Sequence, residues 1–257
     1  MTSMKDPSTA SLRRRWTPAR LAALREQILT QSRIVKGPHR LATDWPESDD
    51  GRLDLRGLPS GREGLQFRYL TLSHVDFRHA RGRLVFFESE LSNCLFDSVS
   101  LSGQPRFDRG FERCSYRDAS LGGLAIGTRV DDCDFTGADL HKVKSLPNTR
   151  FERCRFDAAD LGGAEFVDTT FVDCTFVGAN FSASTSFTRC AFLNAPVVFG
   201  FARVTRSTRD GTALPDQWEG EEEWTATLET YAKRYFAAAA AGNADDLPLD
   251  PEGSLEV

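Results

Sequence analysis

The chain has 257 residues, of which 40% are hydrophobic and 27% charged, and its formal net charge at pH 7 is −5. No apolar run approaches the 18 or more residues of a transmembrane helix, and the N-terminus lacks the apolar core of a secretory signal. The composition is typical of a soluble protein, and the length suits one long domain with flanking segments.

The N-terminal region is expected to be a short tail followed by a helical cap. Residues 1–16 are rich in Ser, Thr and Arg, and we expect them to be disordered. A helix is predicted to begin at Thr17-Pro18, because Thr is a good N-cap and Pro suits the first helical position. Leu21, Leu24 and Ile28 form its apolar stripe. Residues 17–52 are therefore predicted to cover the open end of the segment that follows.

Residues 53–200 follow a five-residue period. The period is clearest over 151–181, where a bulky apolar residue occupies every fifth position and a small residue stands two positions before most of them. A period of five fits neither the helix at 3.6 nor the strand at 2, so it indicates a repeat architecture. The bulky residues of this stretch are Phe151, Phe156, Leu161, Phe166, Phe171, Phe176 and Phe181.

We interpret the period as a chain that turns a corner every five residues and closes after four sides. One coil then takes 20 residues, and coils stack about 4.8 Å apart, as hydrogen-bonded strands do. The bulky residue of each side and the small residue before it point inward and fill the interior. The sequence FERC occurs at 111–114 and again at 151–154, an offset of two coils. We expect about seven coils.

The cysteines follow the same period. All six begin a C-x-[F/Y] triplet, and the first five, spaced by about one coil, are predicted to form a ladder of thiols in the interior. Cys190 follows sooner and is expected one side earlier on its coil. A straight column of thiols suits neither tetrahedral zinc nor a disulfide, so we read these residues as small buried hydrophobes in a reducing cytosol. The ladder is Cys94, Cys114, Cys133, Cys154 and Cys174.

Among the interruptions of the period, two lead to structural predictions. The frame would turn Arg106 inward, and because an unpaired buried charge is costly we expect a local bulge that buries Phe107 instead. The segment HKVKSLPN, His141–Asn148, is expected to form a small projecting loop.

Residues 201–242 are expected to be an exit segment followed by a C-terminal helix. Glutamates near its start suit the helix dipole, and Gly242 is a suitable C-cap. Two roles remain open for this helix, because it can cap the last coil or pair with its copy in a homodimer. Residues 243–257 are expected to be an acidic, disordered tail. The apolar stripe of the helix is Trp224, Leu228, Tyr231 and Tyr235.

Charged residues form rows along the predicted walls. One row reads Ser100, Ser120, Asp139, Asp160 and Asn180, and another stacks Glu112, Asp131 and Glu152 beside Arg113, Asp132, Arg153 and Asp173. They are either solvated ion pairs between coils, each worth little, or an acidic stripe presented to a partner. Residues 65–200 are nearly neutral, which argues against direct binding of nucleic acid. The candidate partner-binding residues are Glu112, Asp131, Asp132, Asp139, Glu152, Asp160, His141, Lys142 and Lys144.

The sequence predicts a binding protein and no enzyme. His74 and His79 are expected on adjacent sides and do not converge, and phosphate-binding, nucleophile-elbow and zinc-protease motifs are missing. No cofactor or metal is predicted.

The A-[D/N]-[L/F] rhythm resembles the pentapeptide-repeat family over about residues 65–198. It is clearest at Ala138-Asp139-Leu140, Ala159-Asp160-Leu161 and Ala179-Asn180-Phe181. The resemblance implies an all-β solenoid, a right-handed quadrilateral parallel β-helix, here with N-terminal and C-terminal capping helices.

Members that shield DNA gyrase and topoisomerase IV from poisons by imitating duplex DNA are similar in outline. The resemblance thus implies a cytoplasmic protein of antibiotic resistance that binds a type II topoisomerase and dimerises through its C-terminal end. The weak net charge and the long N-terminal cap depart from that pattern. A scaffold or adaptor with an unrelated protein partner is the alternative.

Overall fold

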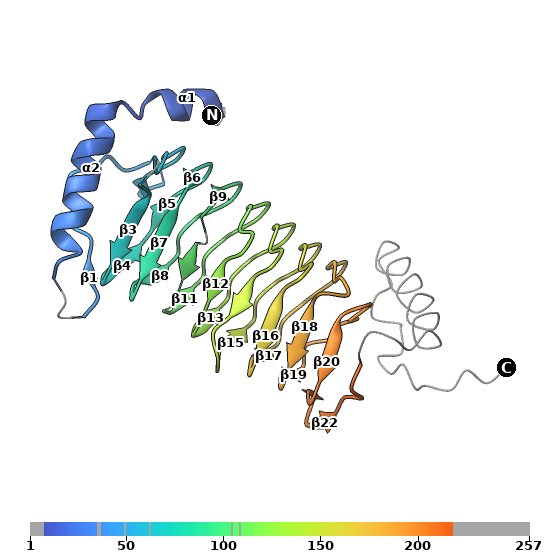
Figure 1. Cartoon of the computed structure of the whole chain (residues 1–257). Coiled ribbons are helices and arrows are strands. Elements are labelled where there is room, and N and C mark those ends of the chain that lie inside the picture. The colour runs from blue at the N-terminus through green and yellow to red at the C-terminus, as the bar shows by residue number, and fades with distance from the viewer. Residues whose placement is uncertain are drawn as a thin grey trace.

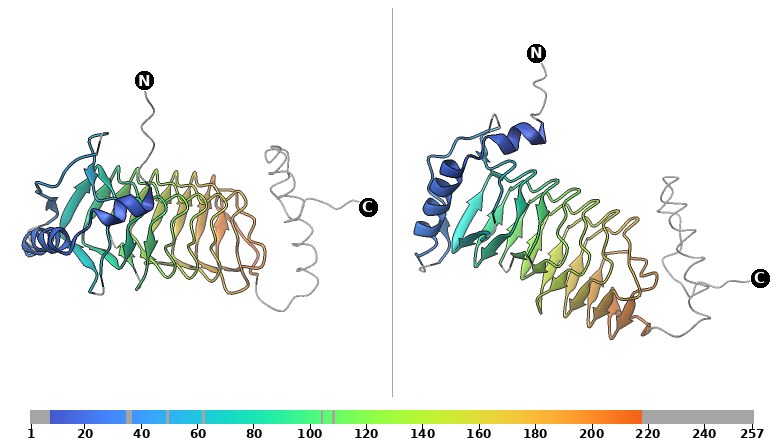
Figure 2. Two further views of the ribbon diagram at one scale, coloured as in Figure 1. Left: turned by 90° about the horizontal axis from the view of Figure 1, so that it is seen from above. Right: turned by 45° about the horizontal axis from the view of Figure 1, so that its top comes forward.

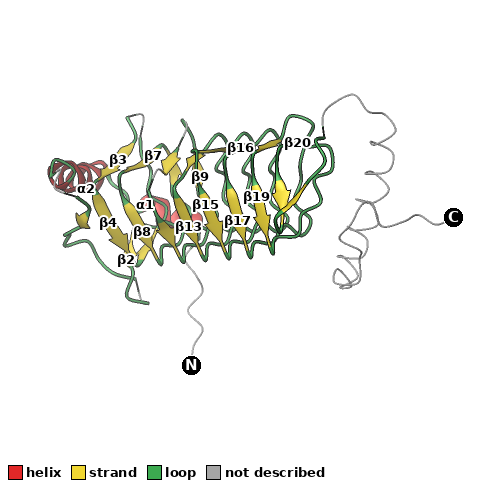
Figure 3. Cartoon of the chain, turned by 90° about the horizontal axis from the view of Figure 1, so that it is seen from below, coloured by secondary structure: helices red, strands yellow, loops and turns green. Residues whose placement is uncertain are grey.

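The structure, a computed structural model, describes residues 8–217 except 35, 36, 49, 62, 104 and 108. Figure 1 shows a rod of stacked turns with helices at its N-terminal end. The described chain holds two helices, α1 (Thr9–Arg14) and α2 (Pro18–Gln31). Strands occupy the length of the rod, and α2 lies across one end of it (Figure 3).

The strands form a parallel solenoid. The largest sheet is parallel throughout except for its last pair, β21 and β22, which are antiparallel. Its strands in spatial order are β1 (His39–Arg40), β4 (Leu70–Ser73), β8 (Glu90–Ser92), β11 (Phe111–Glu112), β13 (Arg129–Asp131), β15 (Arg150–Glu152), β17 (Thr170–Val172), β19 (Ala191–Leu193), β21 (Thr208–Arg209) and β22 (Thr212–Ala213).

A second sheet forms another wall of the rod, and two short pairs lie on the remaining sides. The second sheet contains β3 (Leu65–Arg68), β7 (Leu84–Phe87), β10 (Arg106–Phe107), β12 (Ala125–Ile126), β14 (Lys144–Ser145), β16 (Glu165–Val167), β18 (Ser186–Thr188) and β20 (Arg203–Thr205). The pairs are β2 (Leu53–Asp54) with β5 (Val75–Asp76), and β6 (Arg81–Gly82) with β9 (Ser100–Leu101). We call the outer face of the ten-stranded sheet wall A and that of the eight-stranded sheet wall D.

The solenoid has about eight turns, because eight strands stack in wall D, one more than the sequence suggested. The extra turn contains β20 and β21, in a segment expected to be an irregular exit. Phe187 pairs with Val204, a step of only 17 residues, so a 20-residue period does not find it. Seven spacings of about 4.8 Å give a rod about 34 Å long.

The interior is a column of stacked rings with small residues beside it. Neighbouring rings in the column are nearly parallel, with centroids 4.9 to 5.1 Å apart. The rings are those of Phe96, Tyr116, Phe135, Phe156 and Phe176. All six cysteines are free and buried. Also buried are Phe151, Leu161, Phe166 and Phe171, so the five-residue period specifies which side chains fill the core.

The cysteines lie in the predicted ladder, with Cys190 on another side of the coil. Cys94, Cys114, Cys133, Cys154 and Cys174 each precede a ring of the column by two residues. Cys190 precedes Phe192, which stacks on Phe171 of the ten-stranded sheet, so it lies one side earlier than the others. Burial raises the pKa of the Cys190 thiol to about 12, which agrees with its interpretation as a small hydrophobe.

Helix α2 contacts the outer edge of β3. Thr17 is its N-cap and accepts a hydrogen bond from the Arg20 amide at 3.3 Å. Leu24 and Ile28 are buried in the common core. After the helix ends, the Ser32 hydroxyl lies 3.4 Å from the Gln66 carbonyl and 3.2 Å from the Arg68 amide, so one side chain bonds to two groups of the strand edge.

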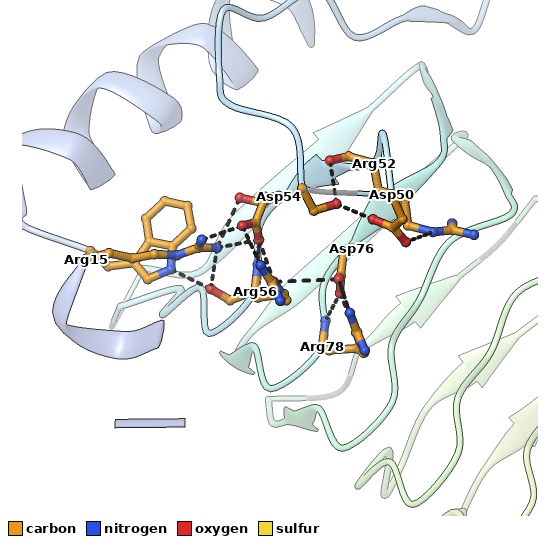
Figure 4. A network of polar contacts seen from close by, with 9 residues as sticks. Arg15, Asp50, Arg52, Asp54, Arg56, Asp76 and Arg78 are labelled. Atoms are coloured by element: carbon orange, nitrogen blue, oxygen red, sulfur yellow. Dashed lines mark hydrogen bonds and ion pairs between the residues drawn. The ribbon is translucent and has the colours of Figure 1, made fainter. Parts of the chain in front are cut away.

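The expected disorder of residues 1–16 is wrong from Thr9 onward, because Thr9–Arg14 is helical. Polar contacts in Figure 4 hold this segment to the first turns: Arg15 donates two hydrogen bonds of 2.6 Å to the Asp54 carboxylate. The indole of Trp16 donates to the Arg56 carbonyl at 2.8 Å. Asp54 also accepts from Arg56, whose guanidinium lies 3.7 Å from Asp76. The partners of Arg15 and Trp16 lie about 40 positions away in sequence, so local patterns could not reveal them.

The predictions made at two interruptions of the period have different outcomes. Phe107 is fully buried, and it pairs in register with Phe86 and Ile126 while Arg106 is exposed, as expected. The prediction of a projecting loop at His141–Asn148 is wrong. Its centre, Lys144–Ser145, is β14 of wall D, with neighbours on both sides. The inward Ser145 hydroxyl lies 2.7 Å from that of Thr169, so a buried polar pair replaces the usual apolar residue.

Candidate interaction surface

The carboxylates Glu112, Asp131 and Glu152 form a row on wall A. Glu112 pairs in register with Asp131, and Asp131 with Glu152, so one carboxylate stands on each of three successive turns. Asp132 occupies the corner beside Asp131 and adopts positive φ, as Arg113 and Arg153 do at the same position of neighbouring turns. The regular corners therefore hold two adjoining rows of charge at strand spacing.

Arginines accompany every carboxylate of this row. Arg129 contacts Asp131 at 2.6 Å, Arg150 contacts Glu152 at 3.1 Å, and Arg113 pairs with Glu112. Arg153 bridges two turns, because it contacts Asp132 at 2.7 Å and also pairs with Glu152. The wall therefore carries alternating charges rather than a continuous acidic stripe.

The arginines change the acidity of two of these carboxylates. A hydrogen bond from Arg153 lowers the pKa of Asp132, and hydrogen bonds from Arg150 and Arg153 lower the pKa of Glu152. Asp132 is exposed and Glu152 is half-buried at the surface, so the ion pairs contribute little to stability. They keep the carboxylates ionised and hold them in place.

A shallow hollow interrupts wall A where Gly110 lacks a side chain. In register, the neighbouring turns carry Glu90 and Arg129. The Oδ1 atom of Asp131, which lines this hollow, is buried and has no hydrogen-bond partner among the described residues. This hollow was not predicted from the sequence, although a glycine in a row of long side chains indicates one.

The remaining candidate residues lie elsewhere. Asp139 and Asp160 pair in register on another side, where Asp160 accepts from Asn180 at 3.0 Å and Asp139 lies 2.5 Å from the His141 ring. Lys144 is on wall D and contacts Glu165 at 3.0 Å. Lys142 stands at a corner with positive φ. The candidate set is thus divided among several sides and does not form one site.

A second hollow lies between residues 40–53 and the first turns of wall A. Its lining includes Arg40, Thr43, Trp45, Glu47 and His74. Trp45 stacks on Trp16, with ring centroids 5.2 Å apart, so the same aromatic pair joins this segment to the N-terminal helices. From the sequence, residues 39–52 were expected only to cover the first coil, and no site was predicted there.

The described part of the chain lacks two further kinds of functional feature. No group of three or more His, Cys, Asp and Glu side chains there could hold a metal ion. None of the helices described is long and apolar enough to cross a membrane. Trp224, Leu228, Tyr231 and Tyr235, predicted to cap or dimerise, lie outside the described residues.

The repeat itself is recognised by comparison with known families. Residues 145–195 match the model of the pentapeptide repeats, in eight copies. The resemblance to the pentapeptide-repeat family is therefore confirmed, and the structure extends the same parallel solenoid to both sides of the matched segment.

Solved structures with some likeness include two of QnrB1, described as a plasmid-mediated fluoroquinolone resistance protein. The full-length form is 14% identical, with 70% of this chain and 96% of that chain covered and a TM-score of 0.29. A trypsin-treated form is 16% identical, with 66% and 85% covered and a TM-score of 0.28.

HetL, from the cyanobacterium Nostoc and described as involved in regulating heterocyst differentiation, is 14% identical. The comparison covers 61% of this chain and 79% of HetL, with a TM-score of 0.21. No curated protein matches the chain. Likenesses this weak carry no argument about function.

Proposed function

We propose that this protein is a non-catalytic binding rod whose walls contact another protein. The observation that supports this most is wall A, where charged side chains project from successive turns and ion pairs hold them in place. Rigid elements present an interface without a large ordering cost on binding. The interior is filled by rings and thiols, which favours the outer walls as the place of contact.

The most specific form of the proposal is shielding of a type II topoisomerase, DNA gyrase or topoisomerase IV, from poisons in the cytoplasm. A rod about 34 Å long matches about one turn of duplex DNA, and carboxylates stand along it. The arginines of wall A weaken the imitation of DNA charge. On binding, basic groups of the enzyme would have to take the place of these arginines as ion-pair partners of Glu112, Asp131 and Glu152.

The test is DNA supercoiling by gyrase, with and without a quinolone, during titration of this protein. We expect micromolar protein to rescue the poisoned enzyme or to inhibit the free one. The variant E112Q/D131N/E152Q should lose the effect, whereas E165Q/D168N, which removes two carboxylates from the wall D side, should retain it. Absence of both rescue and inhibition with the wild type would reject the topoisomerase proposal.

A scaffold or adaptor for an unrelated protein is the second candidate. The mixed charge of wall A favours it, because alternating charges complement a partner of mixed charge better than a purely basic one. Photo-crosslinkers at positions 112 and 152 should then join one specific partner, and the same crosslinkers at 165 and 168 should not. Identical products from both walls would argue against a defined interface on wall A.

A further inference from the structure

The N-terminal helices carry an excess of positive charge. Residues 8–34 contain six arginines and one glutamate. Two of the arginines face the solenoid, where Arg15 contacts Asp54 at 2.6 Å and Arg25 contacts Glu63 at 2.9 Å. The other four are exposed, and among the described residues they form no ion pair. We call this surface the basic cap; its arginines are Arg13, Arg14, Arg20 and Arg33.

The basic cap also exposes apolar side chains. Leu24 and Ile28 bury one side of α2 in the core, and this leaves the opposite side free. Leu29 and Ile34 are 48% and 50% exposed, more than the other large apolar residues described. Figure 2 shows α2 at the extreme end of the rod, with no further turn beyond it. Positive charge beside apolar area suits an acidic segment that contains aromatic residues.

Such a segment follows the last described residue. Residues 218–257 contain ten acidic and two basic side chains. Four of the acidic ones, Glu219 and Glu221–Glu223, stand directly between Trp218 and Trp224. The described chain ends at Gln217, beside β20, which is at the opposite end of the rod from α2 (Figure 1).

The reach of the chain excludes contact between this segment and its own cap. Six residues separate Gln217 from Glu223 and span at most about 21 Å when fully extended. The stack of strands between α2 and β20 is about 34 Å long. The glutamates can therefore meet the basic cap only of another molecule.

We propose that the basic cap binds the Trp218–Trp224 segment of a second copy of this chain, so that rods associate head to tail. The contact is heterologous, because two different surfaces meet. It leaves a free cap on one molecule and a free acidic segment on the other, and further copies can add. This proposal does not depend on a topoisomerase partner, and it differs from a closed dimer through the C-terminal helix.

The first test is sedimentation velocity of the full chain over a concentration series at two ionic strengths. At about 0.1 M salt the mean mass should rise with concentration beyond that of a dimer. At about 1 M salt, where the screening length falls from about 10 to about 3 Å, association should weaken by at least about tenfold. Wild-type protein that stays monomeric throughout, or that stops at a dimer, overturns the proposal.

The second test uses one variant for each surface. R13E/R14E/R20E reverses the charge of three of the four cap arginines, and E219Q/E221Q/E222Q/E223Q removes the charge of the acidic cluster. Each variant alone should be monomeric. Their equimolar mixture should form a dimer and nothing larger, because one variant keeps an intact segment and the other an intact cap. R13K/R14K/R20K keeps the charge and should associate as the wild type does.

Two results would overturn the assignment of these surfaces. One is a mixture that stays monomeric. The other is self-association of R13E/R14E/R20E with wild-type strength, as a closed dimer through the C-terminal segments would give. Because two of the charge reversals in R13E/R14E/R20E lie in α1, the melting temperature of this variant is compared with that of the wild type. R33E, at the other end of α2, repeats the measurement and should weaken association without touching α1.

Discussion

Tyr116 lies in the ring column between Phe96 and Phe135, with ring centroids 4.9 Å from each. Its side chain is buried, and its hydroxyl has no hydrogen-bond partner among the described residues. Burial raises the pKa of this hydroxyl well above its usual value. Every other ring in the column is a phenylalanine, so the hydroxyl adds a desolvation cost without an evident compensating contact.

Replacing Tyr116 by phenylalanine should leave the free energy of unfolding unchanged or raise it by about 1 kcal/mol. The ring and its stacking remain, and only the unpaired hydroxyl is removed. Urea denaturation of Tyr116→Phe beside the wild type measures the difference. A clear loss of stability would mean that a neighbouring thiol bonds to the hydroxyl.

Phe156 tests the packing of the same column. Its ring stacks between Phe135 at 5.1 Å and Phe176 at 5.0 Å, and the side chain is buried. Phe156→Ala should cost about 3–5 kcal/mol, because the turns above and below cannot close the cavity. Val177, 37% exposed on the outside, supplies the control. Val177→Ala should change stability by no more than about 0.5 kcal/mol, and equal effects of the two substitutions in urea denaturation would contradict the packing argument.

Helix α1 is the element whose position depends most on a few polar contacts. Leu12 packs closely against Gly57, which adopts positive φ, and a Cβ at Gly57 would lie only 3.0 Å from the Cβ of Leu12. Arg15 and Trp16 add hydrogen bonds to Asp54 and Arg56. Burial acts to raise the pKa of Asp54, but hydrogen bonds from Arg15 and Arg56 outweigh it and hold this pKa well below its usual value.

The lowered pKa of Asp54 gives the attachment of α1 a defined pH dependence. A carboxylate whose pKa is depressed in the folded state stabilises the fold fully when the pH is above its unfolded-state pKa of about 4. This stabilisation is lost as the pH falls from about 4 toward the folded-state pKa. In the background W218F/W224F, fluorescence reports only Trp16 and Trp45. The spectrum should stay constant from neutral pH to about 4 and change below it.

Arg15→Ala should produce the altered fluorescence already at neutral pH, because the Asp54 contact is then missing. A matched control is Arg14→Ala, an exposed neighbour that forms no ion pair among the described residues. A transition centred near neutral pH in the wild type would show that another group controls the attachment.

At the scale of the whole molecule, the strand edges at the two ends of the rod are covered in different ways. At the N-terminal end α2 and Ser32 contact the free edge of β3. At the other end β22 turns back antiparallel on β21, and Gln217 bridges to Val204. The role of the C-terminal helix predicted around Trp224 and Tyr231 stays a prediction, because these residues lie outside the described part of the chain.

In the R13E/R14E/R20E background, which cannot associate head to tail, we predict that Trp224→Ala combined with Tyr231→Ala lowers the mass measured by light scattering if this helix forms a homodimer. The same pair should lower thermal stability without changing the mass if the helix caps the last turn. Asp245→Asn, further along the chain, is the control and should do neither. A monomeric wild type would refute the homodimer.

Much of the fold could be predicted because its pattern is local and repeated. Each five-residue step places one bulky and one small residue inward, so the positions of Phe156 and Cys154 follow from spacing alone. The same reasoning placed Phe107 inward, because an arginine is too costly to bury. The candidate site was less predictable, since the ion pairs of Glu112 with Arg113 and of Asp131 with Arg129 depend on the directions of long side chains, which the five-residue spacing does not specify.

The sequence by itself determined the square parallel coil, its buried rings and its column of thiols, because a repeated local pattern is enough to specify them. Only the tertiary structure decided the final short turn, the strand at Lys144–Ser145 and the attachment of α1. The final turn steps by only 17 residues and α1 contacts residues about 40 positions away, so neither follows the 20-residue period. The strand at Lys144–Ser145 keeps that period, but its segment lacks the bulky apolar residue that marks the other turns.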